Sequence, residues 1–336
     1  MRSFLRPVCT LLIFGTALFK PLAAQQGSTA AQFLKIGVDA RAAGMGEAAV
    51  ALASDVSALF WNPAGLARVS RMSILISHTS WIADLSHDFI GITVPMGNQT
   101  IGFSLTSLTM GETEITTLEQ PQGTGSFYDA SDFALGISYA RRMTDRLSVG
   151  VSAKYIRQAI VNEVATGFAF DVGTSLDVGV GGLRVAMALT NYGTGMQLQG
   201  DDIVIPYYPG PVSTPIKADI ETSTFPMPTN FRTGISFEVI GQQSFLLPSE
   251  SSTMILAMDG NHPIDAAERG NVGIEYTWNH TIALRTGYKY NYPEQGLSYG
   301  GSVEMESGSS LVTIDYALTK FGVLGNVHRF TIRLGI

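Results

Sequence analysis

"VHRFTIRLGI", residues 327–336, ends the chain with a strict two-residue alternation. Large apolar side chains occupy every second position from Phe330 to Ile336, whereas the positions from Arg329 to Gly335 between them carry polar or small residues. Successive side chains of a β-strand point to opposite faces, so this pattern predicts a strand with one apolar and one polar face.

The same alternation recurs through most of the chain, for example in "TIALRTGYKY", residues 281–290, and "SDFALGISYA", residues 131–140. About ten residues is the length of a strand that crosses a bilayer at a tilt. We expect about fourteen such strands, near residues 71–80, 86–96, 99–110, 131–143, 146–158, 165–178, 181–193, 230–240, 252–260, 269–279, 281–291, 297–306, 309–320 and 327–336.

Composition favours a membrane barrel over a soluble domain. Charged residues make up 15% of the 336 positions, against about 25% in ordinary soluble domains. The mean hydropathy is +0.19, yet no apolar run after residue 20 approaches the ~18–20 residues of a membrane helix. Mild hydrophobicity spread over alternating strands is what an outer-membrane β-barrel needs, since only its outward residues touch lipid.

The predicted connections give a second argument for an antiparallel barrel. Counted from the first strand, the even-numbered connections are mostly tight turns such as Gly97-Asn98, with one exception near 241–251. The odd-numbered ones include the two longest, near 111–130 and 194–229. Outer-membrane barrels have short periplasmic turns and longer outer loops, whereas a Greek-key sandwich has no reason to sort its loops in this way.

The N-terminus has the pattern of an export signal. Two arginines precede a short apolar run at 8–19, and small residues follow, which predicts a signal peptide over 1–24. The single cysteine, Cys9, lies inside this segment, so we expect a mature chain without a disulfide, a thiolate metal site or a cysteine nucleophile.

Motifs that carry catalysis or cofactor binding are not found. "GMGEAA", residues 44–49, has the glycine spacing of a dinucleotide motif but lacks the βαβ pattern around it, so we interpret Gly44 and Gly46 as permitting a tight turn and close packing. The five histidines are too scattered for a metal site, and no G-x-S-x-G elbow occurs. We therefore expect no enzyme activity, no cofactor and no metal.

Charge patterning points to a polar lumen. The net charge of −7, without a basic patch, argues against nucleic-acid binding. We expect the strand carboxylates of Asp171, Asp177, Glu275 and Asp315 to line the lumen, where such charges pair with arginine or set polarity more often than they catalyse.

Residues 25–70 differ from the strands that follow. The stretch from residue 39 to 60 is rich in alanine and favours helix. Asn62 precedes Pro63, which pushes Asn62 out of the helical region of backbone space and should end a short helix there.

This block, "FLKIGVDARAAGMGEAAVALASDVSALFWNPAGLA" over residues 33–67, resembles the PorV/PorQ family of outer-membrane proteins, which is related to the fatty-acid transporter FadL. The matching residues are Asp39, Arg41, Gly44, Gly46, Trp61, Asn62 and Pro63. The resemblance implies a FadL-like barrel of fourteen strands over 71–336 and a small helical hatch, residues 25–70, inside its lumen. It also implies that Trp61 is buried against the barrel interior and does not face lipid.

The resemblance further implies a function and a location. Members of this family belong to the type IX secretion system of Bacteroidota-like bacteria, where they act without catalysis in the outer membrane. Their expected partners are the translocon and secreted cargo proteins, besides outer-membrane lipid and lipopolysaccharide.

The long segment at 194–229 is the candidate partner-binding loop. It contains "IVIPYYPGPVSTP", in which Ile203, Ile205, Tyr207 and Tyr208 stand among four prolines. Long loops in compact proteins are often functional, and exposed apolar patches mark interaction sites. The alternative is that the loop folds over the barrel mouth and buries its own apolar residues.

Two other functions stay open on the sequence alone. A FadL-like channel for hydrophobic small molecules requires an apolar lumen pocket beside the hatch, whereas the predicted inward positions are mainly Gly, Ser, Thr, Arg and Lys, which suit water better. The third possibility is a purely structural barrel.

Overall fold

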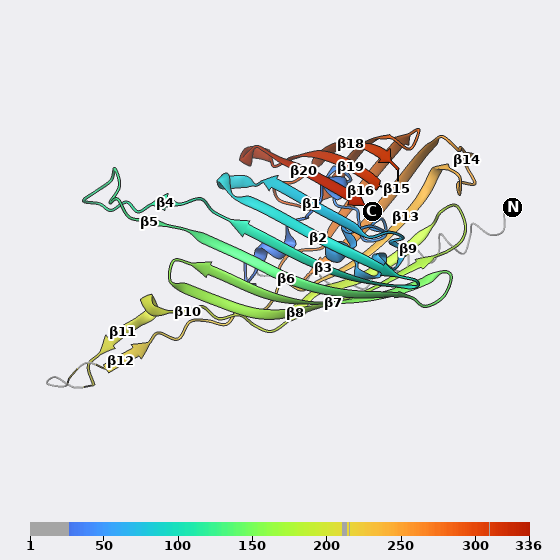
Figure 1. Ribbon diagram of the computed structural model, residues 1–336. Helices are drawn as coiled ribbons and strands as arrows, with labels where there is room; N and C mark the ends of the chain where they lie inside the picture. The colour runs from blue at the N-terminus through green and yellow to red at the C-terminus, as the bar shows by residue number, and fades with distance from the viewer. Residues whose placement is uncertain (1–26, 210–213, 215, 309) are drawn as a thin grey trace.

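The computed structural model describes residues 27–209, 214, 216–308 and 310–336, and its main feature is a closed antiparallel β-barrel (Figure 1). The main sheet of the described chain has sixteen strands, of which the two-residue β10 (Gln199–Gly200) and β14 (Leu247–Pro248) only extend its rims. The other fourteen form the wall. The prediction of a fourteen-stranded barrel is therefore confirmed.

The wall strands follow one another around the barrel in chain order. They are β1 (Ser73–Ser80), β2 (Ser86–Met96), β3 (Gln99–Thr109), β6 (Ala130–Arg142), β7 (Leu147–Ile160), β8 (Glu163–Asp177), β9 (Arg184–Gly193), β13 (Asn230–Gly241), β15 (Ser252–Pro263), β16 (Arg269–Trp278), β17 (Ile282–Tyr290), β18 (Leu297–Ser307), β19 (Ser310–Lys320) and β20 (Asn326–Gly335). Each pairs antiparallel with its neighbours, and β1 closes the barrel on β20 from Ser73↔Gly335 to Ser80↔His328.

Alternation along each strand sorts the side chains between the two surfaces of the wall. On β20 the side chains of Phe330 and Ile332 are exposed on the outside, while Arg329 and Thr331 are buried inside. The outside of the wall is apolar, as contact with lipid requires, and the inside combines polar residues with apolar ones that pack against the lumen contents.

The two ends of the barrel differ. At the end that we call the outer end, β4 (Thr113–Glu114) pairs with β5 (Phe127–Tyr128), and β11 (Val204–Tyr207) pairs with β12 (Ile216–Asp219). Both hairpins project beyond the wall on the same side (Figure 1). The opposite end, where the chain enters β1 and leaves β20, has mainly short turns and is called the turn end. The predicted sorting of long and short connections is confirmed.

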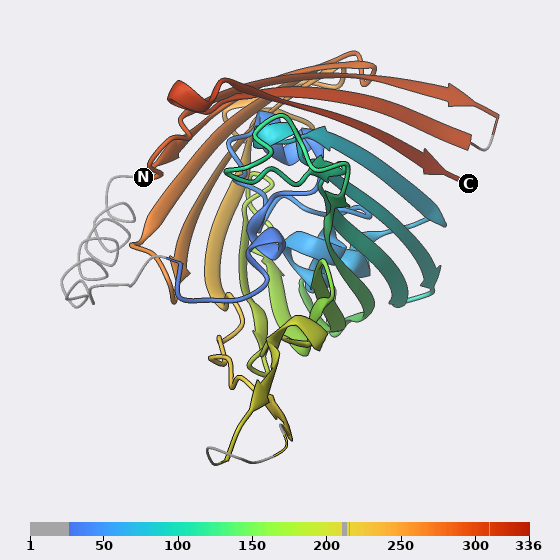
Figure 2. The same ribbon diagram turned by 90° about the vertical axis from the view of Figure 1, so that its left-hand side faces the viewer.

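Short helices fill the lumen. We call residues 27–70 the hatch; the predicted signal peptide lies outside the described residues. The hatch contains η1 (Gln32–Lys35), α2 (Ala40–Gly44), α3 (Ala58–Trp61) and η2 (Pro63–Arg68), all inside the ring of strands (Figure 2). Two further single turns, η3 (Ile82–Asp84) and η5 (Gly322–Leu324), lie in outer-end connections, and η4 (Asp201–Ile203) precedes β11. In the described part of the chain, no helix is both long and apolar enough to cross a membrane.

The hydrophobic core lies between the hatch and the inner wall rather than within a sheet sandwich. Val38, Leu59 and Leu66 of the hatch pack with Leu75 of β1 and Phe89 of β2. An antiparallel barrel of this size cannot fill its lumen with strand side chains alone, so the hatch supplies the apolar interior.

Candidate functional site

Asp39 joins the two halves of the hatch motif. One carboxylate oxygen accepts a hydrogen bond from the backbone N–H of Ala42 at 2.8 Å and so caps the start of α2. The other accepts one from Nε1 of Trp61 at 2.7 Å. The Asp39 and Trp61 segments of the sequence motif are thus one hydrogen-bonded unit.

Trp61 also contacts the wall. Its side chain is only 3% exposed, which confirms that it does not face lipid. The guanidinium of Arg232, on β13, lies over the Trp61 ring at 5.1 Å, and the Phe60 ring meets it edge-on with centroids 4.9 Å apart. Trp61 is therefore held between the hatch and one side of the barrel.

Asn62 and Pro63 end α3 and attach the chain to the wall at β8, which is separated from β13 only by β9. Asn62 is extended, and its side-chain amide donates to the carbonyl of Val50 and to that of Thr174 on β8, both at 3.1 Å. Its side-chain oxygen accepts from the N–H of Ala64, which starts η2 behind Pro63. A Cβ placed on wall residue Gly173 would collide with the Asn62 side chain. Small wall residues are thus needed where the hatch touches the strands.

Gly44 and Gly46 lie against the backbone of β17 and β18. A Cβ on Gly44 would press on Gly300, and one on Gly46 would collide with the backbone of Tyr288. Gly46 also has a positive φ of 64° and donates its N–H to Ser298 Oγ at 3.0 Å. The interpretation as a tight turn with close packing is confirmed.

Arg41 of α2 connects the hatch to a row of charges on the wall. Its guanidinium donates to Glu275 of β16 at 2.9 and 2.6 Å. Glu275 also accepts from Arg285 of β17 at 2.5 Å, and Arg285 donates to Asp315 of β19 at 2.8 Å. These side chains are largely buried, so their charges interact with little screening by solvent.

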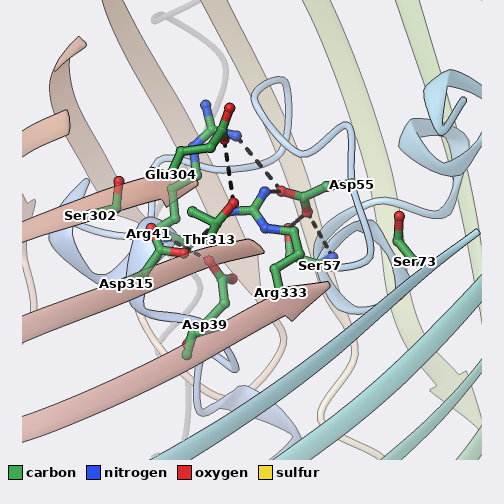
Figure 3. Close-up of polar contacts among 12 residues, drawn as sticks. Asp39, Arg41, Asp55, Ser57, Ser73, Ser302, Glu304, Thr313, Asp315 and Arg333 are labelled. Atoms are coloured by element: carbon green, nitrogen blue, oxygen red, sulfur yellow. Dashed lines mark hydrogen bonds and ion pairs between the residues drawn. The ribbon is translucent and has the colours of Figure 1, made fainter. Parts of the chain in front are cut away.

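Asp55 provides a second ionic attachment of the hatch. Arg333 of β20 donates to Asp55 and, at 3.2 Å, to Asp315, as Figure 3 shows. Arg41 lies 3.8 Å from Asp55, which joins the two attachments into one network. We call Arg41, Asp55, Glu275, Arg285, Asp315 and Arg333 the ionic lock; its three positive and three negative groups balance.

The other predicted lumen carboxylates are paired as well. Asp171 forms an ion pair with Lys154 at 2.7 Å, and Asp177 pairs with Arg68 of the hatch and with Arg184 of β9. These contacts agree with the expectation that the lumen carboxylates form ion pairs with basic side chains.

At the outer end, Asp265 fastens η1 to the connection between β15 and β16. Its carboxylate accepts from Thr29 at 2.6 Å, Gln32 at 2.9 Å and Lys35 at 2.9 Å. Burial alone would raise the pKa of Asp265, but the hydrogen bonds from Gln32, Thr29 and Lys35 outweigh it and hold this pKa below its usual value.

This anchor makes the first hatch turn sensitive to acid. A carboxyl whose pKa is lower in the folded state stabilises that state above its ordinary pKa, about 3.9, and loses the contribution as pH falls through the lowered pKa. We expect the N–H of Leu34, which donates to Ala31, to lose hydrogen-exchange protection only below about pH 4. Asp265→Asn should show weaker protection without that pH dependence; protection that falls with pH equally in both proteins would contradict this role.

The candidate partner loop forms a projecting hairpin and does not fold over the barrel mouth. We call residues 201–220 the outer hairpin; residues 210–213 and 215 of its tip lie outside the described residues. Ile205, Tyr207 and Tyr208 are 43, 52 and 60% exposed, and Ile203 is half-buried at its base. The described part projects away from the barrel (Figure 1), so the alternative of a loop folded over the mouth is wrong for these residues.

An apolar cavity of about 500 Å³ lies near the base of this hairpin. It is bounded by the first hatch residues, by the outer ends of β6, β7 and β8, and by the segment that follows β9. Ala30, Ile160, Met196, Leu198 and Phe225 line it. Sequence reasoning missed this cavity, because Met196, Leu198 and Phe225 come from a segment without strand periodicity.

Comparison with solved structures identifies the same barrel architecture. The toluene transporter TbuX of Ralstonia pickettii is 13% identical, with a TM-score of 0.55 over 89% of this chain and 97% of that one. The toluene transporter TodX of Pseudomonas putida is 11% identical, with a TM-score of 0.57 over 89% and 96%. At these identities the likeness concerns the fold alone. No curated protein matches the chain in sequence.

Comparison with protein families identifies the family of the chain, whereas the solved structures identify only its fold. The family described as "Type IX secretion system protein PorV" matches residues 23–249, which include the hatch, the wall as far as β13 and the outer hairpin. The chain therefore belongs to the PorV family of type IX secretion system proteins, outer-membrane β-barrels of Gram-negative bacteria.

Proposed function

We propose that this protein is a non-enzymatic component of type IX secretion that binds translocon or cargo proteins through its outer hairpin. The observation that carries the proposal is the row of exposed apolar and aromatic side chains on a hairpin that projects beyond the lipid-facing wall. Lipid contact accounts for apolar residues on the wall, but it does not account for those on a hairpin that leaves the barrel.

The chemistry of the hairpin supports a protein partner. Tyrosine is enriched in the energetic centres of protein interfaces, because it combines a large apolar surface with a hydrogen-bonding hydroxyl. Besides Tyr207 and Tyr208, the hairpin exposes the three carboxylates of Asp201, Asp202 and Asp219 and the amine of Lys217, and Glu221 directly after it is exposed as well. The complementary surface is therefore an apolar patch with a basic rim.

The hatch supports binding in preference to passage of a folded protein through the lumen. Residues 27–70 are held by the ionic lock at the turn end and by Asp265 at the outer end. In this proposal the barrel is a closed membrane anchor for the hairpin, in a Bacteroidota-like outer membrane with lipopolysaccharide around it.

Substitution of the hairpin residues tests the proposal. The triple variant Ile205→Ser, Tyr207→Ser and Tyr208→Ser should reduce co-purification of translocon or cargo at least about tenfold, since interface hot spots contribute about 2 kcal/mol or more each. The matched control is Ile115→Ser, Leu118→Ser and Phe127→Ser, three exposed residues of the other projecting hairpin. Equal loss in both variants, or no loss in either, would count against the outer hairpin as the binding surface.

A second function is favoured by one observation, the apolar cavity near the outer hairpin. A cavity lined by Ala30, Met196 and Phe225 suits a small hydrophobic molecule. In this alternative the chain is a FadL-like channel, as TbuX and TodX are transporters of toluene. Ala165→Phe should fill the cavity. If a hydrocarbon binds the purified unchanged barrel but not this variant, the result would favour transport of a small hydrophobic molecule over secretion.

A further inference from the structure

A separate, polar cavity lies between the hatch and the wall at the outer end. Its volume is about 200 Å³, and residues of η1, β13, β15, β16 and two outer connections line it. Five of them carry side-chain amides: Gln32, Asn230, Asn261, Asn271 and Gln295. Amides both donate and accept hydrogen bonds, so this lining differs in kind from the apolar cavity near the hairpin.

Arg232 of β13 supplies the charge of this polar cavity. Its side chain lines the cavity and is only 5% exposed, yet Nε and Nη1 have no hydrogen-bond partner among the described residues. The guanidinium lies over the rings of Phe60 and Trp61 at 5.6 and 5.1 Å, which fixes its position. A buried cation with unpaired donors is costly unless a ligand or water pairs with it.

Asn230, two residues earlier on the same face of β13, repeats this feature. It is 8% exposed, and its side-chain oxygen has no hydrogen-bond partner in the described part of the chain. Two neighbouring inward side chains thus present unpaired donors and an unpaired acceptor to one cavity. Such a pair is expected where a ligand with both kinds of polar group binds.

Of the other charges at the cavity, Arg269 lies over the Tyr292 ring at 4.5 Å, and the remaining two form ion pairs within the protein. Lys35 contacts Asp265 at 2.9 Å, and Glu47 contacts Lys289 at 2.7 Å. Asp259, the inward carboxylate of β15, lies outside the cavity lining, and its Oδ2 accepts from the backbone N–H groups of Ala49 and Val50. Among the described residues, no carboxylate forms a salt bridge with Arg232, so the cavity favours an anion.

We propose that this cavity binds a small hydroxylated carboxylate of the size of one sugar acid. The carboxylate pairs with Arg232, and the hydroxyl groups bond to Asn230 and the other amides. A volume equal to roughly seven waters at 30 Å³ each accommodates a compact molecule and excludes a long acyl chain. The inference concerns a ligand site of the lumen and does not depend on the outer hairpin.

Binding to the folded full-length mature barrel in detergent tests this site. The probes are D-glucuronate, D-glucose and oleate, measured by titration calorimetry and by tryptophan fluorescence, since Trp61 and Trp81 line the cavity. Glucuronate should bind at least about tenfold more tightly than glucose, because a hydrogen bond to a charged group contributes about 1.5–3 kcal/mol. Oleate should not compete.

Variants separate the carboxylate contact from a structural role. Arg232→Gln should weaken glucuronate binding about ten- to hundredfold. The control is Arg157→Gln: Arg157 of β7 lies over the ring of Phe133 on β6, away from the cavity, and its substitution should leave binding unchanged. Because Arg232 also packs on Trp61, Asn230→Leu is the second variant; it leaves that packing intact and should still weaken binding several-fold.

Three results would overturn the assignment. They are no glucuronate binding by the unchanged protein, equal affinity for glucose and glucuronate, or displacement of glucuronate by oleate. The serine variant of the outer hairpin should bind glucuronate normally, so failure of this site and failure of the secretion proposal are distinguishable.

Discussion

Glu275→Ala is expected to release the hatch at the turn end while the barrel wall stays folded. Glu275 accepts from Arg41 of the hatch and from Arg285 of the wall, and all three side chains are largely buried. Removing one partner of a buried ion pair leaves uncompensated charge and costs about 3–5 kcal/mol. The strands are held by backbone ladders that the substitution does not touch, so the loss should fall on the hatch.

Hydrogen exchange can distinguish release of the hatch from unfolding of the barrel wall. The N–H of Met45 donates to carbonyls of α2, and its exchange rate should rise in proportion to the stability that the hatch loses. Amides of β16 and β17 should keep their protection. Glu306→Ala, at an exposed carboxylate of β18 near the turn end, is the control and should change stability by less than about 0.5 kcal/mol. Unchanged exchange at Met45 in Glu275→Ala would contradict the lock.

The double variant Arg41→Met with Glu275→Leu sharpens this test. If the cost of Glu275→Ala comes from unpaired buried charge, replacing both partners by apolar residues should restore part of the protection. Arg285 keeps its contact with Asp315 in this variant. A double variant as loose as the single one would mean that the specific geometry of the ion pair matters more than its charge balance.

The wall was predictable because lipid and lumen impose opposite chemistry on alternate residues. The last strand, expected over 327–336, spans Asn326–Gly335, and the other thirteen were also located from alternation. The hairpin strands Val204–Tyr207 and Ile216–Asp219 were not, since each has only four residues and the first contains Pro206, so the alternation is too short to recognise. Polar loops and short hairpins have no two-sided environment to enforce periodicity.

The site was predictable only in part. Alternation shows that Glu275 and Arg333 face the lumen, but it does not show at what depth, or which hatch residue they meet. Arg41 and Glu275 are separated by 234 positions, and their contact depends on the strand tilt and the path of the hatch. Arg232 looks like any other lumen arginine until Phe60 and Trp61 are placed beneath it.

Trp61→Ala is expected to loosen the hatch by about 3–5 kcal/mol, the usual cost of deleting a large buried aromatic side chain. Trp61 is 3% exposed and contacts Phe60, Arg232 and Asp39, so its loss leaves a cavity and removes the donor from a buried carboxylate. Trp278→Ala is the matched control: that ring is 58% exposed on the wall, and its loss should spare the hatch.

Trp61→Phe divides the effect between packing and hydrogen bonding. Phenylalanine keeps most of the ring but cannot donate to Asp39, so it should cost about 1–3 kcal/mol, the penalty for a buried acceptor without its partner. Limited proteolysis at the hatch, followed by gel mobility without boiling, distinguishes a loosened hatch from an unfolded barrel. If Trp61→Ala unfolds the wall together with the hatch, the two form one cooperative unit, which would contradict the expectation that the loss falls on the hatch alone.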